Sequence, residues 1–116
     1  MALIFSRGEI VLTKFPFTDF SGTTVRPALV VSPGMIGNDL ILAGISSVVR
    51  GVLPPTDCLV DTAHPEFAAT GLRVPSVLRM HKLVTVEHSL VLRRLGRLGP
   101  QLLVEMDAKL RVATGT

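Results

Sequence analysis

The segment TTVRPALVVS, residues 23–32, joins a short polar stretch to an arginine, a proline and an apolar run. Pro27 has no N–H and pushes the residue before it toward extended geometry, so Arg26 is expected to be rigidly held. The run from Ala28 to Val31 has the composition of a strand covered on both faces. A guanidinium at the mouth of such a strand suits a phosphate or a carboxylate, although an arginine on a flexible surface loop is the plain alternative.

Short apolar runs bounded by Gly, Pro, Asn and Asp indicate a β-rich chain. We expect strands at residues 8–15, 28–32, 40–45, 58–61 and 76–87, the fourth at a sheet edge and the last with a bulge at Lys82. Residues 89–98 have two equally good interpretations. They form either a turn followed by a short strand or a basic amphipathic turn.

A helix is expected after Gly99, with Pro100 at its first position and an apolar stripe formed by Leu103, Met106, Leu110 and Ala113. One terminal helix after several short strands predicts a mainly β chain: a small, strongly curved barrel with a helix on its side. The 116 residues are expected to form a single domain spanning residues 1–116.

Two apolar strands end in polar or cationic residues. If the strands at 28–32 and 40–45 are antiparallel neighbours, the start of the first lies beside the end of the second. This assumed pairing brings Arg26 near Ser46, which follows Ile45.

Composition limits the partners and the compartment. Between residues 73 and 97 there are six basic residues and one acid, which favours a polyanion or an acidic protein over a merely solvated basic face. Hydrophobic residues make up 47% of the chain and charged residues 18%, so a buried apolar surface and a homodimer are expected. With Cys58 as the only cysteine, no signal-peptide pattern and no apolar run long enough to span a bilayer, we predict a cytoplasmic protein without membrane contact.

Several motifs in order resemble the PemK/MazF family of toxins from bacterial type II toxin–antitoxin systems, over essentially the whole chain. They are GEIVL at residues 8–12, FPFTD at 15–19, RPALVVS at 26–32, AGISS at 43–47, GL at 71–72 with PSVLR at 75–79, and LGRL at 95–98 before the helix.

The resemblance implies an SH3-like small barrel of the CcdB/MazF toxin type with a C-terminal α-helix. It also implies a homodimeric, metal-independent endoribonuclease, needing no cofactor, that acts as an mRNA interferase on single-stranded RNA, arrests growth and is neutralised by a cognate antitoxin. The active centre carries over to Arg26 and Ser46. Family members usually have Thr where Ser46 stands, and many have an acidic residue where Ser21 stands.

RNA-binding residues are predicted from the first loop, the strand ends and the basic segment: Thr23, Thr24, Ser47, Arg50, Arg73, Arg79 and His81. Phe17 and Phe20 are stacking candidates, with a core role the more common one. No metal site is expected, because Asp57, Asp61 and His64 fit no strong ligand motif.

Metal-free RNA cleavage uses the 2′-OH as nucleophile and needs charge stabilisation and two proton transfers. Arg26 and Ser46 supply positioning and charge, but a guanidinium stays protonated and is a poor base. His81 and His64 change charge in the right pH range, although a structural role is the commoner one for each, and Asp19 is a weaker candidate.

Two other functions fit the same sequence features. The same barrel can act as a non-catalytic toxin on a protein target such as gyrase, or as a binding module without toxicity. If the wild type cleaves RNA and Arg26→Ala does not, the chain is an endoribonuclease and neither a non-catalytic toxin nor a binding module.

Overall fold

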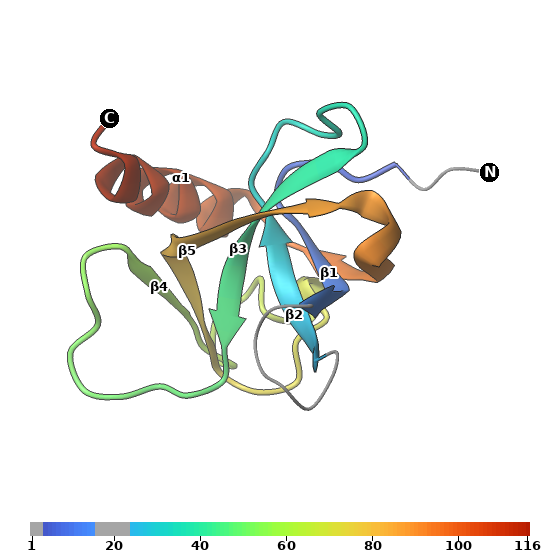
Figure 1. Ribbon diagram of the computed structural model, residues 1–116. Helices are drawn as coiled ribbons and strands as arrows, with labels where there is room; N and C mark the ends of the chain where they lie inside the picture. Colours follow the sequence, from blue (N-terminus) through green and yellow to red (C-terminus); the bar gives the residue numbers. More distant parts are fainter. Residues whose placement is uncertain (1–3, 16–23) are drawn as a thin grey trace.

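The computed structural model describes residues 4–15 and 24–116. Within them, a six-stranded antiparallel sheet has the order β4-β5-β3-β2-β1-β6 (Figure 1). The elements are β1 (Glu9–Phe15), β2 (Thr24–Val30), β3 (Asp39–Ser46), β4 (Asp57–Val60), η1 (Ala68–Thr70), β5 (Ser76–Glu87), η2 (His88–Leu90), β6 (Val91–Arg97) and α1 (Pro100–Thr114).

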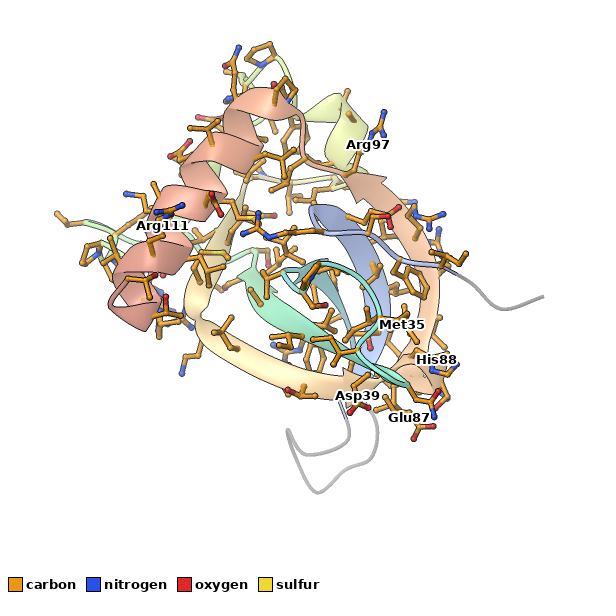
Figure 2. All side chains as sticks on the ribbon, turned by 90° about the horizontal axis from the view of Figure 1, so that it is seen from above. Met35, Asp39, Glu87, His88, Arg97 and Arg111 are labelled. Atoms are coloured by element: carbon orange, nitrogen blue, oxygen red, sulfur yellow. The ribbon has the colours of Figure 1, made fainter. Side chains whose placement is uncertain are left out.

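The sheet is strongly curved, and its strands wrap around a common centre when seen from above (Figure 2). The helix α1 covers one side, against β5 and β4. The predicted mainly β barrel with a C-terminal helix is therefore confirmed. So are the short edge strand β4 and the strand alternative for the segment before the helix.

The run from Ala28 to Val31, at the end of β2, is buried on both faces, as its composition predicted. Leu29 and Val31 belong to the core cluster that includes Leu102 and Met106 of α1. Ala28 belongs to a second cluster on the other face of the sheet, together with Val30 and residues of β1, β3 and β6. Because both faces are covered from Ala28 to Val31, an apolar residue is favoured at each of these positions. Val25 and Arg26, nearer the start of the strand, are exposed.

The start of β2 differs from the prediction. The strand begins at Thr24, so Arg26 lies inside it and not at its mouth. The reason is long-range pairing, because β1 pairs with β2 as far as Thr24 and places Thr13 opposite Arg26. On the other side, the pairing of β2 with β3 covers only residues 28–30. Pro27, which has no N–H to donate, stands where that ladder stops.

The long strand β5 carries the predicted bulge. Its register with β3 jumps, because Ala43 pairs with Leu83 while the next residue, Gly44, pairs with Arg79. Residues 80–82 are thus extra on the β5 side, and the strand bends there. The sequence pattern placed the apolar side chains of β5 on one face of the strand. Because of the bend, they are divided between the two core clusters. Residues 78 and 80 join the cluster under α1, whereas residues 84 and 86 join the other cluster.

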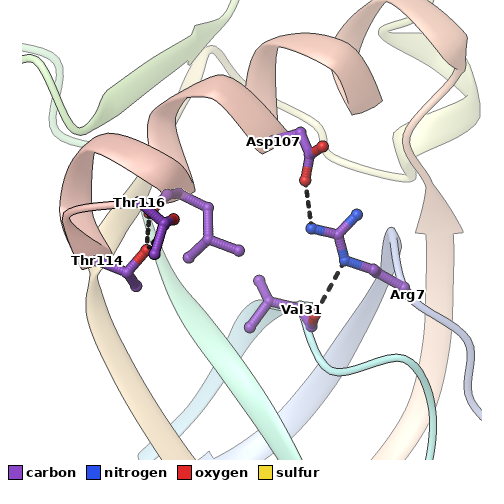
Figure 3. A network of polar contacts seen from close by, with 6 residues as sticks. Arg7, Val31, Asp107, Thr114 and Thr116 are labelled. Carbon is purple, nitrogen blue, oxygen red and sulfur yellow. Dashed lines mark hydrogen bonds and ion pairs between the residues drawn. The ribbon is translucent and has the colours of Figure 1, made fainter.

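Helix α1 begins at Pro100, as predicted, with Gly99 as its N-cap residue. The predicted stripe is present but extended, since Leu102 is fully buried together with Met106. The helix is also tied to the N-terminal segment, where the Arg7 guanidinium donates to Asp107 Oδ1 at 2.5 Å and to the Val31 carbonyl at 3.1 Å (Figure 3). The Arg7 hydrogen bond and charge hold the pKa of the Asp107 carboxyl below its ordinary value.

Within the described part of the chain, no helix has both the length and the apolar character that crossing a membrane requires.

Candidate functional site

Three adjoining pockets lie around the ends of β2, β3 and β5. The Lys82 pocket, of about 430 Å³, is lined by Phe15, Arg26, Pro27, Gly44, Ile45, Ser46, Arg79, Lys82, Leu83 and Val84. The Arg73 pocket, of about 570 Å³, is lined by Arg26, Pro27, Ile45, Ser46, Ser47, Val48, Gly71, Leu72, Arg73, Val74, Ser76, Arg93 and Leu95. The Asp57 pocket, of about 330 Å³, is lined by Ser46, Val48, Arg50, Leu53, Pro54, Asp57, Val77 and Arg79.

Arg26 and Ser46 come together as the sequence predicted. Strands β2 and β3 are antiparallel neighbours, and Ala28 pairs with Gly44. Both Arg26 and Ser46 lie two residues beyond this pair, past the end of the ladder at Pro27. Both side chains line the Lys82 pocket and the Arg73 pocket. The end of regular pairing thus leaves a guanidinium and a hydroxyl beside an open space.

The local contacts of these two side chains leave them available to a ligand. Ser46 Oγ accepts a hydrogen bond from the Val48 N–H at 3.1 Å. A hydroxyl that accepts in this way still has its proton to donate. Arg26 is exposed, and none of the ion pairs within residues 4–15 and 24–116 involves it. A charged donor and a neutral donor therefore face the pockets.

Asp57 is a site residue that sequence reasoning missed. It starts β4 and pairs with Arg79 of β5, and only 5% of its side chain is exposed. The Arg79 Nε lies 3.8 Å from Asp57 Oδ2, and the His81 Nδ1 lies 3.4 Å from Asp57 Oδ1. Thr56 Oγ1 lies 2.8 Å from the same His81 nitrogen. A buried carboxylate therefore sits beside two basic side chains of β5.

The predicted RNA-binding residues divide between the pockets. Arg73 and Ser47 line the Arg73 pocket, Arg50 lines the Asp57 pocket, and Arg79 lines both the Asp57 pocket and the Lys82 pocket. His81 lines none of the three and contacts Asp57 instead.

Several of the predicted site residues lie outside the part of the chain that the structure describes. Thr23, Phe17, Phe20 and Asp19 lie outside the described residues, and of Thr24 only the backbone is described, as the first residue of β2. Two further cations line the pockets, Lys82 and Arg93, and the only sequence signal for them was the basic segment between residues 73 and 97.

Two further residues with reactive side chains, His64 and Cys58, have structural roles. His64 Nδ1 accepts the Glu66 N–H at 3.0 Å, which places any proton of the neutral ring on Nε2 and favours the structural role over acid–base work. Burial and the nearby Glu105 raise the pKa of the Cys58 thiol to about 12, so the thiol stays protonated at neutral pH and is no nucleophile.

The fold and the site define a small curved β-barrel with a cationic cleft suited to a polyanion. Residues 6–114 match the sequence profile of the PemK-like, MazF-like toxins of type II toxin–antitoxin systems. The chain belongs to this family.

Solved structures agree with the family in fold. MazF from Deinococcus radiodurans is 19% identical, with 99% of this chain and 100% of that chain covered and a TM-score of 0.74. The Mycobacterium tuberculosis toxin MazF-mt6 is 20% identical, with 92% and 96% covered and a TM-score of 0.69. An endoribonuclease in complex with its cognate antitoxin, from a mycobacterial species, is 16% identical, with 95% and 94% covered and a TM-score of 0.70. A comparison with curated protein sequences finds no match.

Proposed function

We propose that the chain is an endoribonuclease toxin that cleaves single-stranded RNA at specific sequences, without a metal ion, by attack of the 2′-OH on the neighbouring phosphorus. The observation that carries the proposal is the shared position of Arg26 and Ser46, which line two adjoining pockets together with further cations. Family membership and the toxins of similar fold, among them a mycobacterial endoribonuclease, support it.

Each side chain has a distinct task in this reaction. Arg26 binds two phosphoryl oxygens through its planar fork, and Ser46 donates its hydroxyl proton to one of them. Arg79 and Lys82, which line the same pocket, add positive charge where the phosphorane-like transition state becomes more negative. This arrangement accounts for positioning and charge stabilisation.

Proton transfer needs a different group. Among the described residues that line the Lys82 pocket, none is a histidine or a carboxylate. The proton of the 2′-OH therefore passes to water or to a residue beyond this lining. A pH profile of the cleavage rate shows at which pH the group that accepts this proton titrates, because the rate rises with the unprotonated fraction of that base.

The proposal includes partners. Val48, Val49 and Val52 are exposed to 57%, 43% and 99% in the loop after β3. Such apolar side chains suit burial by a second copy of the chain or by an antitoxin segment. Neighbours in fold include a toxin solved with its cognate antitoxin, and the cationic pockets suit an acidic antitoxin chain. A cytoplasmic location follows from an mRNA substrate.

The test is cleavage of a long RNA by the purified protein in excess chelator, comparing wild type with Arg26→Ala. We expect fragments with 5′-OH ends from wild type, and a loss of at least about 10²-fold in rate for the variant, because a transition-state contact is removed. A 2′-deoxy nucleotide at the cut position blocks cleavage.

Arg111→Ala is the matched control, because Arg111 is an exposed arginine of α1 and no residue of α1 lines the three pockets. Intact RNA across varied sequences contradicts the proposal. Growth arrest by a protein that leaves RNA intact favours the non-catalytic alternative on a protein target.

A further inference from the structure

The Asp57 pocket directly adjoins the proposed phosphate site. It shares Ser46 with both other pockets and Arg79 with the Lys82 pocket. When a phosphate is bound between Arg26 and Ser46, an adjacent nucleotide of the same strand can therefore reach the Asp57 pocket. Its volume of about 330 Å³ is at the lower end of the range for small-molecule sites, which suits one nucleobase better than a larger ligand.

The pocket is lined by four apolar residues and four polar or charged ones. Val48, Leu53, Pro54 and Val77 supply aliphatic surface, against which the flat faces of a base can pack. Arg50 stands at the same pocket as a positive charge for the backbone of a bound strand. This composition differs from that of the Lys82 pocket, where the polar residues are cations and one serine.

Asp57 is the unusual group in this pocket, because a carboxylate repels a phosphate. Only 6% of the residue is exposed, and its contacts are long for hydrogen bonds: 3.8 Å to Arg79, and 3.4 Å to both His81 and Thr56 Oγ1. A buried carboxylate with two oxygens and about four lone-pair sites retains capacity for further donors. The partner that it accepts must supply N–H groups and not another anion.

The four RNA bases differ in what they offer a carboxylate. Guanine presents N1–H and an N2 amino group side by side, which match the two carboxylate oxygens. Cytosine and adenine present an amino group next to a ring acceptor, and uracil presents one N–H between two carbonyl oxygens. Two parallel hydrogen bonds are formed only with guanine, and bidentate pairs are the contacts that discriminate most between bases.

We propose that the Asp57 pocket is a base-reading subsite that selects guanine, with the Asp57 carboxylate accepting hydrogen bonds from guanine N1–H and N2–H. The subsite makes Asp57 a specificity-determining residue for RNA cleavage, and in this respect the inference rests on the proposed function. The Arg79 guanidinium balances the charge of the carboxylate, and His81 lies against its other oxygen.

The experiment maps cut sites on a long RNA for wild type, Asp57→Asn and the matched control Asp39→Asn, an exposed Asp of β3 outside all three pockets. In wild type and in the control, cut sites share a guanine at one fixed position next to the cut. In Asp57→Asn this preference falls by about tenfold or more, because the amide replaces one acceptor oxygen with a donor. No fixed guanine, or an unchanged preference in the variant, overturns the subsite.

A second measurement does not depend on the fold of the variant. Replacing that guanine with inosine removes only the 2-amino group, and we expect kcat/KM of the wild type to fall about tenfold. An unchanged kcat/KM contradicts the proposed contact.

If wild type cuts no RNA, the proposed function fails, and binding decides the subsite separately. Guanosine and inosine 5′-monophosphates are then titrated into wild type and Asp57→Asn. A preference for guanosine that the variant loses supports the subsite, and equal affinities overturn it.

Discussion

Ser46 is the residue at which the three pockets meet, since it contributes to the lining of each. Its hydroxyl accepts from the Val48 N–H, and this hydrogen bond fixes the oxygen while the proton remains to be donated. A phosphate that binds Arg26 therefore meets a neutral donor with a fixed position, which costs little reorganisation when charge develops in the transition state.

Two substitutions test the contribution of the Ser46 hydroxyl to cleavage: one removes the hydroxyl, and the other retains it on a different side chain. We expect Ser46→Ala to lower kcat by about 10²-fold with little change in KM, because the lost contact strengthens only in the transition state. Ser46→Thr retains the hydroxyl and suits a strand position, so it should keep most of the activity. Cleavage rates on one RNA oligonucleotide measure both, with Ser89→Ala, an exposed serine of η2, as control. Equal rates for the alanine variant and wild type would remove Ser46 from the site.

At the scale of the element, the strands could be predicted because their signals are local. Runs of β-branched and apolar residues bounded by turn residues indicated five of the six strands, and the phase break at Lys82 indicated the bulge. For the segment that forms β6 the sequence left a short strand and a basic amphipathic turn equally open. The start of β2 could not be predicted, because pairing with β1 continues the strand beyond its own apolar run to Thr24.

The candidate site was predictable in one part and not in another. The placing of Arg26 and Ser46 at the same pockets followed from antiparallel neighbours, which consecutive strands commonly are. Asp57 meets Arg79 through the register between β4 and β5, and no local pattern in the sequence encodes that register. In the sequence Asp57 appeared only in a set of residues that fit no strong metal-ligand motif, and its burial against β5 is visible only in the structure.

Close backbone approach positions one wall of the Arg73 pocket. A Cβ on Gly96 of β6 would lie 2.3 Å from the Ala69 carbonyl oxygen, and one on Gly71 would lie 2.1 Å from the Leu95 carbonyl oxygen. The two glycines thus allow η1 and β6 to pack with their backbones in contact. Arg73, two residues after Gly71, lines the same pocket as Arg26.

The N-terminus of α1 has its cap supplied from a distant segment. Gly99 offers no capping side chain, and Glu66 takes that role. Its Oε2 accepts the Gln101 N–H at 3.0 Å and its Oε1 accepts the Leu102 N–H at 2.8 Å. Desolvation acts to raise the pKa of Glu66, but the two hydrogen bonds and the nearby His64 outweigh it, so the pKa lies below its ordinary value of 4.5.

This cap predicts a pH-dependent stability. Glu66→Gln should lower the free energy of unfolding at pH 7, because one charged acceptor at the helix N-terminus is lost. The carboxylate contributes fully above the unfolded-state pKa near 4.5, and the contribution is lost as pH falls through the lower folded-state pKa. The difference between wild type and variant should therefore narrow below about pH 4.5 in urea unfolding curves. Glu87→Gln, at an exposed site on β5, is the control, and a difference that persists at pH 2 contradicts the assignment.

For the whole molecule, the distribution of charge matters more than the net value of +3. The basic segment between residues 73 and 97 is divided by the fold. Arg73 and Arg93 face the Arg73 pocket, and Arg79 and Lys82 face the Lys82 pocket. Arg94 has a structural task instead, because it forms an ion pair with Glu9, donates to the Ile4 carbonyl at 2.6 Å and stacks over the Phe5 ring.

This division predicts how salt affects RNA binding. Each cation that neutralises a phosphate of single-stranded RNA contributes about 0.7 to the slope of log K against log salt concentration. Arg73→Ala should weaken binding to every sequence alike and reduce the slope by about 0.7, because a phosphate contact carries no base information. Arg94→Ala, in the same segment, should leave the slope unchanged, since its charge is already balanced by Glu9. Fluorescence anisotropy with an uncleavable oligonucleotide carrying 2′-deoxy nucleotides measures both slopes between 50 and 200 mM salt, a range in which counterion release changes affinity strongly. Equal reductions for the two variants would mean that the basic segment acts as one diffuse field, whereas a reduction confined to Arg73→Ala locates the RNA backbone in the Arg73 pocket.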